Sequence, residues 1–125
     1  MREPIHTESA PKAIGPYSQA ISCDGWLYCS GQIPLDPISG EIIGNDVSAQ
    51  THQVMKNLGA VLEAGGSGFS KVVKTTIYLK SMDDFAAVNE VYGSYLSDPY
   101  PARVTIQAAR LPKDVFVEVD AIARA

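Results

Sequence analysis

The chain has 125 residues, enough for one domain with its own core, and 46% of its residues are hydrophobic. Its formal net charge is −4 and it contains no run of lysine or arginine, which argues against a nucleic-acid-binding face, because phosphates require clustered cations. The N-terminus lacks the apolar core of a signal peptide and no apolar run approaches the length of a membrane span. We therefore predict one soluble domain, residues 1–125, in a reducing cytoplasmic setting.

The first part of the chain predicts short strands joined by turns. Residues 9–16 are rich in turn formers and are expected to be irregular, whereas residues 17–21 and 26–30 are typical of strands. Residues 31–37 are expected to form a loop, because their prolines cannot donate to a central strand. Cys29 lies in an apolar run and is predicted to be a small buried residue. A bridge or metal pair with Cys23 is the alternative.

A long helix is predicted over residues 46–64. Asp46 is a typical N-cap, and apolar residues recur behind it at helical spacing. The glycine-rich residues 65–68 also resemble a phosphate loop, but they follow a helix and lack a downstream Lys-Ser/Thr, so a helix end is the better interpretation. Neither His6 nor His52 has the spacing of a metal ligand. We predict no metal and no organic cofactor.

A strand and a second helix follow. Residues 71–79 are dense in valine, threonine and isoleucine and are the strongest strand of the chain. Ser81 and Asp84 resemble a capping box at the start of the helix, and the prolines of residues 99–101 stop it. This helix is predicted to bury five apolar side chains: Phe85, Val88, Tyr92, Tyr95 and Leu96.

The last quarter of the chain carries the residues with the clearest chemistry. Residues 101–107 and 117–120 alternate apolar and polar side chains, which predicts two strands. If these strands pair, one face is aliphatic and the other places Arg103 near Glu118. An arginine on a rigid strand suits bidentate capture of a ligand carboxylate, and a glutamate beside it can handle a proton. The alternative is a solvated sheet face on which the two residues form an ion pair.

The order of these elements, β-β-α-β-α-β-β, predicts one sheet covered on one face by two amphipathic helices. The uncovered face is expected to carry Arg103, Glu118 and four aromatic side chains: Trp26, Tyr28, Tyr78 and Phe116. A monomer rarely leaves so much aromatic surface in water. We therefore predict that this face packs against other copies of the chain, which makes its polar cluster a cleft at an interface.

Several motifs occur in order along the chain: APKAIGPYSQA at residues 10–20, SGQIP at 30–34, VVKTT at 72–76, Asp84-Phe85 with Val88-Asn89, and Pro-Ala-Arg at 101–103 followed by Leu111-Pro112 and Val117-Glu118. Together they resemble the RidA (YjgF) family of enamine/imine deaminases over essentially the whole chain. The resemblance implies an α+β, chorismate-mutase-like fold, with a mixed sheet backed by two helices. It also implies a homotrimer whose sheets form a central barrel with three clefts between subunits.

The resemblance further implies the reaction. Members similar to this chain hydrolyse 2-imino and 2-enamino acids, such as 2-iminobutanoate and 2-iminopropanoate from pyridoxal-phosphate-dependent dehydratases, to 2-keto acids and ammonia. In the family, the arginine that matches Arg103 grips the substrate carboxylate, and the glutamate that matches Glu118 positions or activates water. No nucleic-acid or membrane partner is expected.

Five further residues match positions that line or shape the family's cleft: Tyr17, Ser30, Gly31, Asn89 and Thr105. Four of them have a simpler interpretation, namely strand packing for Tyr17, a strand end for Ser30 and Gly31, and an exposed helix turn for Asn89. Thr105 stands where many members have cysteine. Because water can attack a protonated imine directly, the predicted chemistry requires no nucleophile at this position, and Thr105 keeps a substrate-binding role through its backbone.

Other functions remain open at this point. Relatives have been described as RNA-cleaving translation inhibitors and as chaperone-like proteins, and the same arginine would also serve a module that only binds keto acids. Turnover of a freshly generated imino acid distinguishes an enzyme from a binding module.

Overall fold

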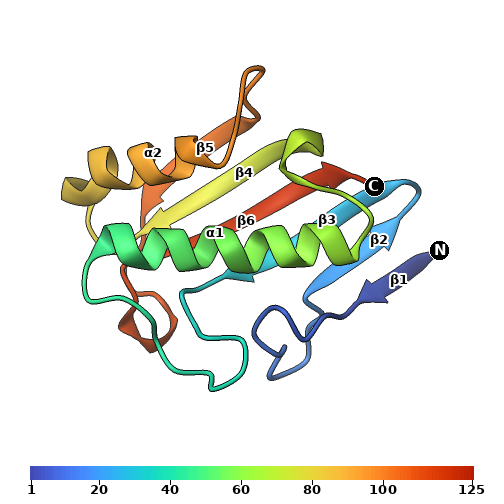
Figure 1. The fold of residues 1–125 in the computed structure, drawn as a ribbon, viewed down its shortest axis with the longest axis horizontal. Helices are drawn as coiled ribbons and strands as arrows, with labels where there is room; N and C mark the ends of the chain where they lie inside the picture. Colours follow the sequence, from blue (N-terminus) through green and yellow to red (C-terminus); the bar gives the residue numbers. More distant parts are fainter.

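A computed structural model describes residues 1–125, which form one six-stranded sheet with two helices on one of its faces (Figure 1). The strand order is β1-β2-β3-β6-β4-β5. All neighbours are antiparallel except β4 and β5, which are parallel. The strands are β1 (Arg2–Ile5), β2 (Ala20–Cys23), β3 (Trp26–Gln32), β4 (Val72–Leu79), β5 (Ala102–Gln107) and β6 (Val117–Arg124). The helices are α1 (Val47–Ala64) and α2 (Phe85–Ser94), with short 3₁₀ turns η1 (Phe69–Lys71), η2 (Met82–Asp84) and η3 (Pro112–Asp114).

Local signals set the ends of α1. The Asp46 carboxylate accepts a hydrogen bond of 2.8 Å from the amide of Ala49, so it satisfies one of the free N–H groups of the first turn. The helix ends at Gly65, where a Cβ atom would lie only 2.6 Å from the side chain of Leu27. Both ends were predicted from the sequence and are confirmed.

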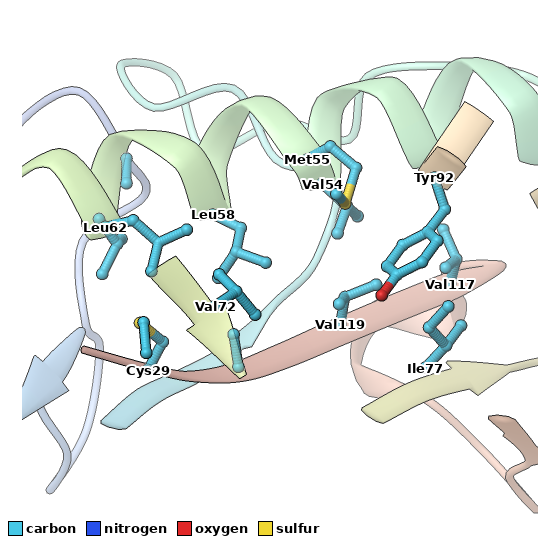
Figure 2. Packing of buried hydrophobic residues seen from close by; sticks show 14 of the residues in the cluster. Cys29, Val54, Met55, Leu58, Leu62, Val72, Ile77, Tyr92, Val117 and Val119 are labelled. Atoms are coloured by element: carbon cyan, nitrogen blue, oxygen red, sulfur yellow. The ribbon is translucent and has the colours of Figure 1, made fainter. Parts of the chain in front are cut away.

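The core lies between α1 and the centre of the sheet. Figure 2 shows side chains of α1 meeting side chains of β4 and β6, among them Val54, Leu58, Ile77, Val117 and Val119. All five are fully buried. Complete burial of a side chain of this size contributes about 1.5–3 kcal/mol relative to exposure, so this layer fixes the sheet against the helices.

The other face of the sheet carries no helix (Figure 1). Three apolar side chains on it remain largely exposed: Tyr28 at 48%, Val104 at 45% and Ile106 at 44%. The predicted layering of a mixed sheet backed by two helices is therefore confirmed. We call the two sides the helix face and the open face.

The predicted pairing of the last two strands is wrong. Strand β4 lies between them, with β5 parallel on one side and β6 antiparallel on the other. Strands β4 and β5 are joined through α2, and a parallel neighbour requires such a crossover. Strand β6 therefore pairs with β3 and β4, and β5 is left at the edge of the sheet.

The N-terminal prediction also needs correction. The strand expected at residues 17–21 spans Ala20–Cys23, and an additional strand, Arg2–Ile5, pairs with it at the sheet edge. The short length of β1 and its proline explain why the alternation signal was weak. At the second helix, Ser81 caps η2 by accepting a hydrogen bond from Asp83, and Asp84 adds no side-chain cap, so the expected capping box is only half formed.

Both cysteines are free, and no bridge joins them. Cys29 is buried in the core, as predicted. Burial raises the pKa of its thiol to about 12, with a further contribution from the negative charge of Asp120. A thiol with this pKa stays protonated at neutral pH and is a poor nucleophile. No helix of the chain combines the length and the apolar character needed to cross a membrane.

Candidate active site

Arg103 projects from the edge strand β5 on the helix face. In the parallel register of β4 and β5 it lies beside Thr75, which is buried under the helices. Its Nη1 donates a hydrogen bond of 2.6 Å to Oδ1 of Asn89. Its Cζ lies 5.5 Å from the ring centre of Phe85 and 5.4 Å from that of Tyr92. Three side chains of one helix therefore surround the guanidinium.

No carboxylate of the chain neutralises Arg103. The single ion pair of the structure joins Lys80 to Asp114, at 3.0 Å. The groups around the guanidinium are an amide oxygen and two aromatic rings, which attract a cation without cancelling its charge. A planar, uncompensated guanidinium suits bidentate binding of an anionic carboxylate.

An open hollow of about 470 Å³ lies beside this guanidinium. Its lining comes from α2 and from the segment that leads into β5: Asn89, Tyr92, Gly93, Tyr100, Pro101 and Arg103. The volume falls in the range of small-molecule sites. The hollow gives a small acid a place to lie next to Arg103.

Glu118 lies on the open face, on the central strand β6. Its carboxylate lies directly over Gly31, so closely that a Cβ atom at position 31 would come 2.0 Å from Oε2. Only glycine lets the carboxylate approach the backbone in this way. Gly31 therefore makes room for the Glu118 carboxylate, in addition to lying near the end of its strand.

The surroundings of Glu118 favour its protonated form. Burial raises the pKa of its carboxyl group, and the nearby negative charge of Asp120 raises it further. Asp120 itself accepts hydrogen bonds from the amide of Thr76, at 3.2 Å, and from the hydroxyl of Tyr78, at 3.1 Å. A carboxyl group with a raised pKa exchanges protons closer to neutral pH, which suits general acid–base catalysis.

Tyr17 and Ser30 lie on adjoining segments next to Gly31. The Ser30 hydroxyl donates a hydrogen bond of 2.6 Å to the carbonyl of Ser18, and the Ser30 amide donates one of 2.9 Å to the carbonyl of Gln19. These bonds hold the segment that carries Tyr17 against the end of β3. The Tyr17 side chain is 53% exposed, so it does not simply pack the N-terminal strand.

Gln19 organises this corner of the molecule, and sequence reasoning did not find it. Its side chain is 2% exposed. The side-chain oxygen accepts from the amide of Thr7, and the side-chain nitrogen donates to the carbonyls of Thr7, Ala10 and Pro11. A buried glutamine has no periodic signature, so only the fold shows that it fixes the segment before Tyr17.

Thr105 lies two residues along β5 from Arg103 and on the same face, beside Ile77 of β4. Its hydroxyl oxygen is buried and has no hydrogen-bond partner. The position is close to Arg103, as the substrate-binding prediction requires, but the structure gives the hydroxyl no task within the chain.

Within one chain, the structure does not bring Arg103 and Glu118 together. Arg103, Asn89 and Thr105 lie at the helix face, whereas Glu118 pairs with Tyr78 in register on the open face. The expected shared face and the alternative ion pair are both wrong. The predicted site residues form two groups, the arginine group (Asn89, Arg103 and Thr105) and the glutamate group (Tyr17, Ser30, Gly31 and Glu118).

The four aromatic residues expected on the uncovered face of the sheet are less exposed to solvent than predicted. Trp26 stacks with Arg124, whose Cζ lies 4.6 Å from its ring centre, and the amine of Lys80 lies 5.4 Å from the ring centre of Phe116. Tyr78 is half-buried and bonded to Asp120. Of the four, only Tyr28 is largely exposed, whereas two aliphatic residues of β5, Val104 and Ile106, are exposed as well.

The fold and the two groups define a small α+β protein with an uncompensated arginine and a partly buried carboxylic acid at its surface. A family model described as "Endoribonuclease L-PSP" matches residues 7–125. A 2-iminobutanoate/2-iminopropanoate deaminase of Mus musculus is 48% identical over 98% of this chain and 91% of its own length. The chain belongs to the RidA (YjgF) family.

Two further relatives agree with this assignment. A RutC family protein of Pyrococcus horikoshii is 54% identical over 98% of both chains. The crystal structure of RidA from an Antarctic Psychrobacter is 41% identical, with a TM-score of 0.94 over 98% of this chain and 99% of that one. The similarity therefore extends over nearly the whole chain.

Proposed function

We propose that this chain hydrolyses small 2-imino and 2-enamino acids to 2-keto acids and ammonia, without a cofactor. The observation that carries the proposal is the uncompensated guanidinium of Arg103 beside an open hollow. Such a substrate always has a carboxylate next to its reactive carbon, and a fixed guanidinium orients that carbon by binding the carboxylate at two points. The activity of the mouse relative supports the same reaction class.

The remaining chemistry requires one group that moves protons. A protonated imine is already electrophilic, so the oxygen of water adds to its carbon while Glu118 takes a proton from that water. The carbinolamine that forms receives that proton on its nitrogen from Glu118. Its C–N bond then breaks and ammonia leaves, while the hydroxyl oxygen gives its remaining proton to the Glu118 carboxylate and forms the carbon–oxygen double bond. Glu118 finally returns this second proton to the departing ammonia or to solvent. A carboxyl group with a raised pKa serves both steps, because it accepts and returns a proton near neutral pH.

The complete site requires two copies of the chain in this proposal. Arg103 and Glu118 lie on opposite faces of one sheet, so no rotamer change joins them around one substrate. The exposed apolar side chains of the open face supply a reason for association, since burial against a second copy removes them from water. We propose a closed homotrimer with its sites between subunits, where three sheets enclose a barrel and further growth stops.

Turnover tests the reaction. An amino-acid oxidase or a dehydratase generates 2-iminopropanoate or 2-iminobutanoate in a cuvette, and semicarbazide traps the imine that survives. The chain should suppress the trapped product in proportion to its concentration, and Arg103→Ala should not. If the chain binds 2-oxobutanoate but does not reduce the amount of trapped product, it is a binding module and not an enzyme.

Mixing two inactive variants tests the shared site. Arg103→Ala and Glu118→Gln each remove one group, and subunits are exchanged between them at equal amounts. If each site combines Arg103 of one copy with Glu118 of the next, every mixed ring regains one complete site, which is about a quarter of all sites in the sample. A mixture that stays as inactive as its parts, although subunit exchange is complete, would mean that a site does not combine Arg103 of one copy with Glu118 of another.

RNA cleavage is the second candidate, because the description of the family model names it. The net charge of −4 disfavours a polyanionic substrate. Incubation of the purified chain with single-stranded RNA, with Arg103→Ala as control, tests this activity in parallel with the imine assay.

A further inference from the structure

A buried pair of hydroxyl groups lies directly beneath Arg103. The hydroxyl of Tyr92, on α2, and that of Thr75, on β4, are 2.7 Å apart. Tyr92 is 5% exposed and Thr75 is 2% exposed, so water does not supply either hydroxyl with a partner. Each hydroxyl satisfies the other, which fixes the tyrosine ring at one height above the sheet. Figure 2 shows Tyr92 pointing from α2 towards the sheet with its hydroxyl foremost.

The same ring supports the guanidinium. Thr75 and Arg103 are neighbours in the register of β4 and β5, so a ring that reaches Thr75 lies beside the arginine side chain. The Cζ of Arg103 is 5.4 Å from the ring centre of Tyr92, and Phe85 stands at a similar distance, 5.5 Å. Burial raises the pKa of the Tyr92 hydroxyl, and the ring therefore stays neutral and acts on the cation only through its π face.

Asn89 alone does not hold the arginine. It engages one nitrogen, Nη1, and Arg103 is otherwise an exposed side chain with several freely rotating bonds. A contact at a second point, on the face of the guanidinium, is needed to define its plane. The rings of Tyr92 and Phe85 both lie near the guanidinium, but only the Tyr92 ring is held in place by a hydrogen bond, to Thr75.

We infer that Tyr92, held by Thr75, is a positioning residue that fixes the plane of the Arg103 guanidinium for carboxylate capture. The inference rests on the proposed function for its consequence in turnover, although the positioning itself is measurable without it. Because the residue acts on binding of the carboxylate and touches no reacting atom, its loss raises KM and leaves kcat nearly unchanged.

The test compares Tyr92→Leu with Tyr95→Leu. Tyr95 also has a hydrogen-bonded hydroxyl, but it is half-buried, its partner is Nδ1 of His52, at 2.9 Å, and its ring packs near Phe69. It therefore matches the chemistry of Tyr92 without a contact to Arg103. In the imine assay, we expect Tyr92→Leu to raise KM about three- to tenfold and to change kcat less than about twofold. We expect Tyr95→Leu to leave both within about twofold.

A second readout does not depend on activity. The Nε–Hε group of Arg103 gives its own NMR signal, and the order parameter of that group reports how firmly the guanidinium is held. We expect a lower order parameter in Tyr92→Leu and an unchanged one in Tyr95→Leu. If Tyr92→Leu does not fold, Tyr92→Phe with Thr75→Val removes both hydroxyls while the packing volume is kept, and the order parameter should again fall.

The outcomes separate the two proposals. An inactive wild-type chain with a loosened Arg103 in Tyr92→Leu defeats the proposed function and supports the positioning. An active chain in which Tyr92→Leu and Tyr95→Leu raise KM equally, or in which the Arg103 order parameter stays the same in every Tyr92 variant, defeats the positioning.

Discussion

The arginine group and the glutamate group treat charge in opposite ways. Arg103 stands on an edge strand, exposed, with neutral partners that leave its positive charge in force. Glu118 stands on a central strand, partly buried, beside another carboxylate that disfavours its negative charge. The surroundings of Arg103 leave its positive charge available to an anion, whereas those of Glu118 favour the neutral, protonated carboxyl group. A reaction that begins with a bound carboxylate and proceeds by proton transfer needs one of each.

Loss of the arginine should have the largest effect. Two charge-assisted hydrogen bonds to a carboxylate contribute about 1.5–3 kcal/mol each, so we expect Arg103→Ala to lower kcat/KM by roughly 10²–10⁴-fold. Arg103→Lys should also be badly impaired, because a point charge does not replace the planar fork. Circular dichroism should show an intact fold in both. Near wild-type turnover of Arg103→Lys would exclude bidentate capture.

Loss of Glu118, the proposed proton-transfer residue, should have the next largest effect. We expect Glu118→Gln to lower kcat by about a hundredfold, since general acid–base help is worth roughly 10²–10⁴-fold. The wild-type pH profile should fall on the acid side at a pH above the pKa of an ordinary glutamate, because the carboxyl pKa is raised. That limb should disappear in Glu118→Gln. A variant with full activity and the same limb would remove Glu118 from the mechanism.

The substitution Gly31→Ala tests whether the close approach of Glu118 to Gly31 matters for activity. Gly31→Ala places a Cβ atom 2.0 Å from the Glu118 carboxylate, which must move. We expect a loss of about ten- to a hundredfold in kcat, because displacement of a catalytic group by about 1 Å costs this much. Gly68→Ala is the matched control, since no atom lies within 4 Å of a Cβ there. Equal effects of the two substitutions would contradict the close approach.

The raised pKa of Glu118 should also make the stability of the chain depend on pH. Because the folded-state pKa of Glu118 is raised, the native chain binds this proton more tightly than the unfolded chain. The resulting stability is fully present below the unfolded pKa and is lost as pH rises through the folded pKa. Glutamine never ionises, so Glu118→Gln should melt a few degrees higher at neutral pH and lose this advantage below about pH 4. A lower Tm at every pH would contradict this sign.

The smallest effect is expected at Thr105. Its hydroxyl has no partner in the chain and the reaction needs no covalent nucleophile, so Thr105→Ala should keep turnover within about threefold. Steady-state kinetics of the purified variant measure this directly. An inactive Thr105→Ala together with a fully active Glu118→Gln would show that Thr105, and not Glu118, is required for the reaction.

The sequence predicted the elements well because their signals are local. Asp46 and Gly65 mark the ends of α1 by their own chemistry, and alternation in β5 correctly grouped Arg103 with Thr105. Alternation shows which side chains of a strand share a face, but it does not show which of the two faces packs against the helices. The apolar residues of β6 face the helices, whereas Val104 and Ile106 of β5 face the opposite way. The prediction placed the apolar residues of both strands on one face, and it therefore put Arg103 on the same face as Glu118, which is wrong.

That error has a physical origin in long-range pairing. The position of β6 between β3 and β4 follows from contacts across the whole chain, which no short window contains. Arg103 was named from the pattern of its strand, and Asn89 and Thr105 from the resemblance. Phe85 and Tyr92 were assigned to the core, because a ring that packs under a helix and a ring that faces a cation have the same spacing. Roles of the individual site residues stay predictions until the variants are measured.

The hydrogen bonds of Gln19 tie a long irregular segment to the rest of the molecule through one side chain. Segments with few regular backbone bonds open locally at a small free-energy cost, and their amides exchange with solvent sooner than those of the core. The segment from Thr7 to Pro11 should therefore open as one cooperative unit whose protection depends on a single amide group. In Gln19→Leu, deuterium would enter the amide of Thr7 early, while the centre of β6 stayed protected, and the wall that carries Tyr17 would loosen before any other part of the domain.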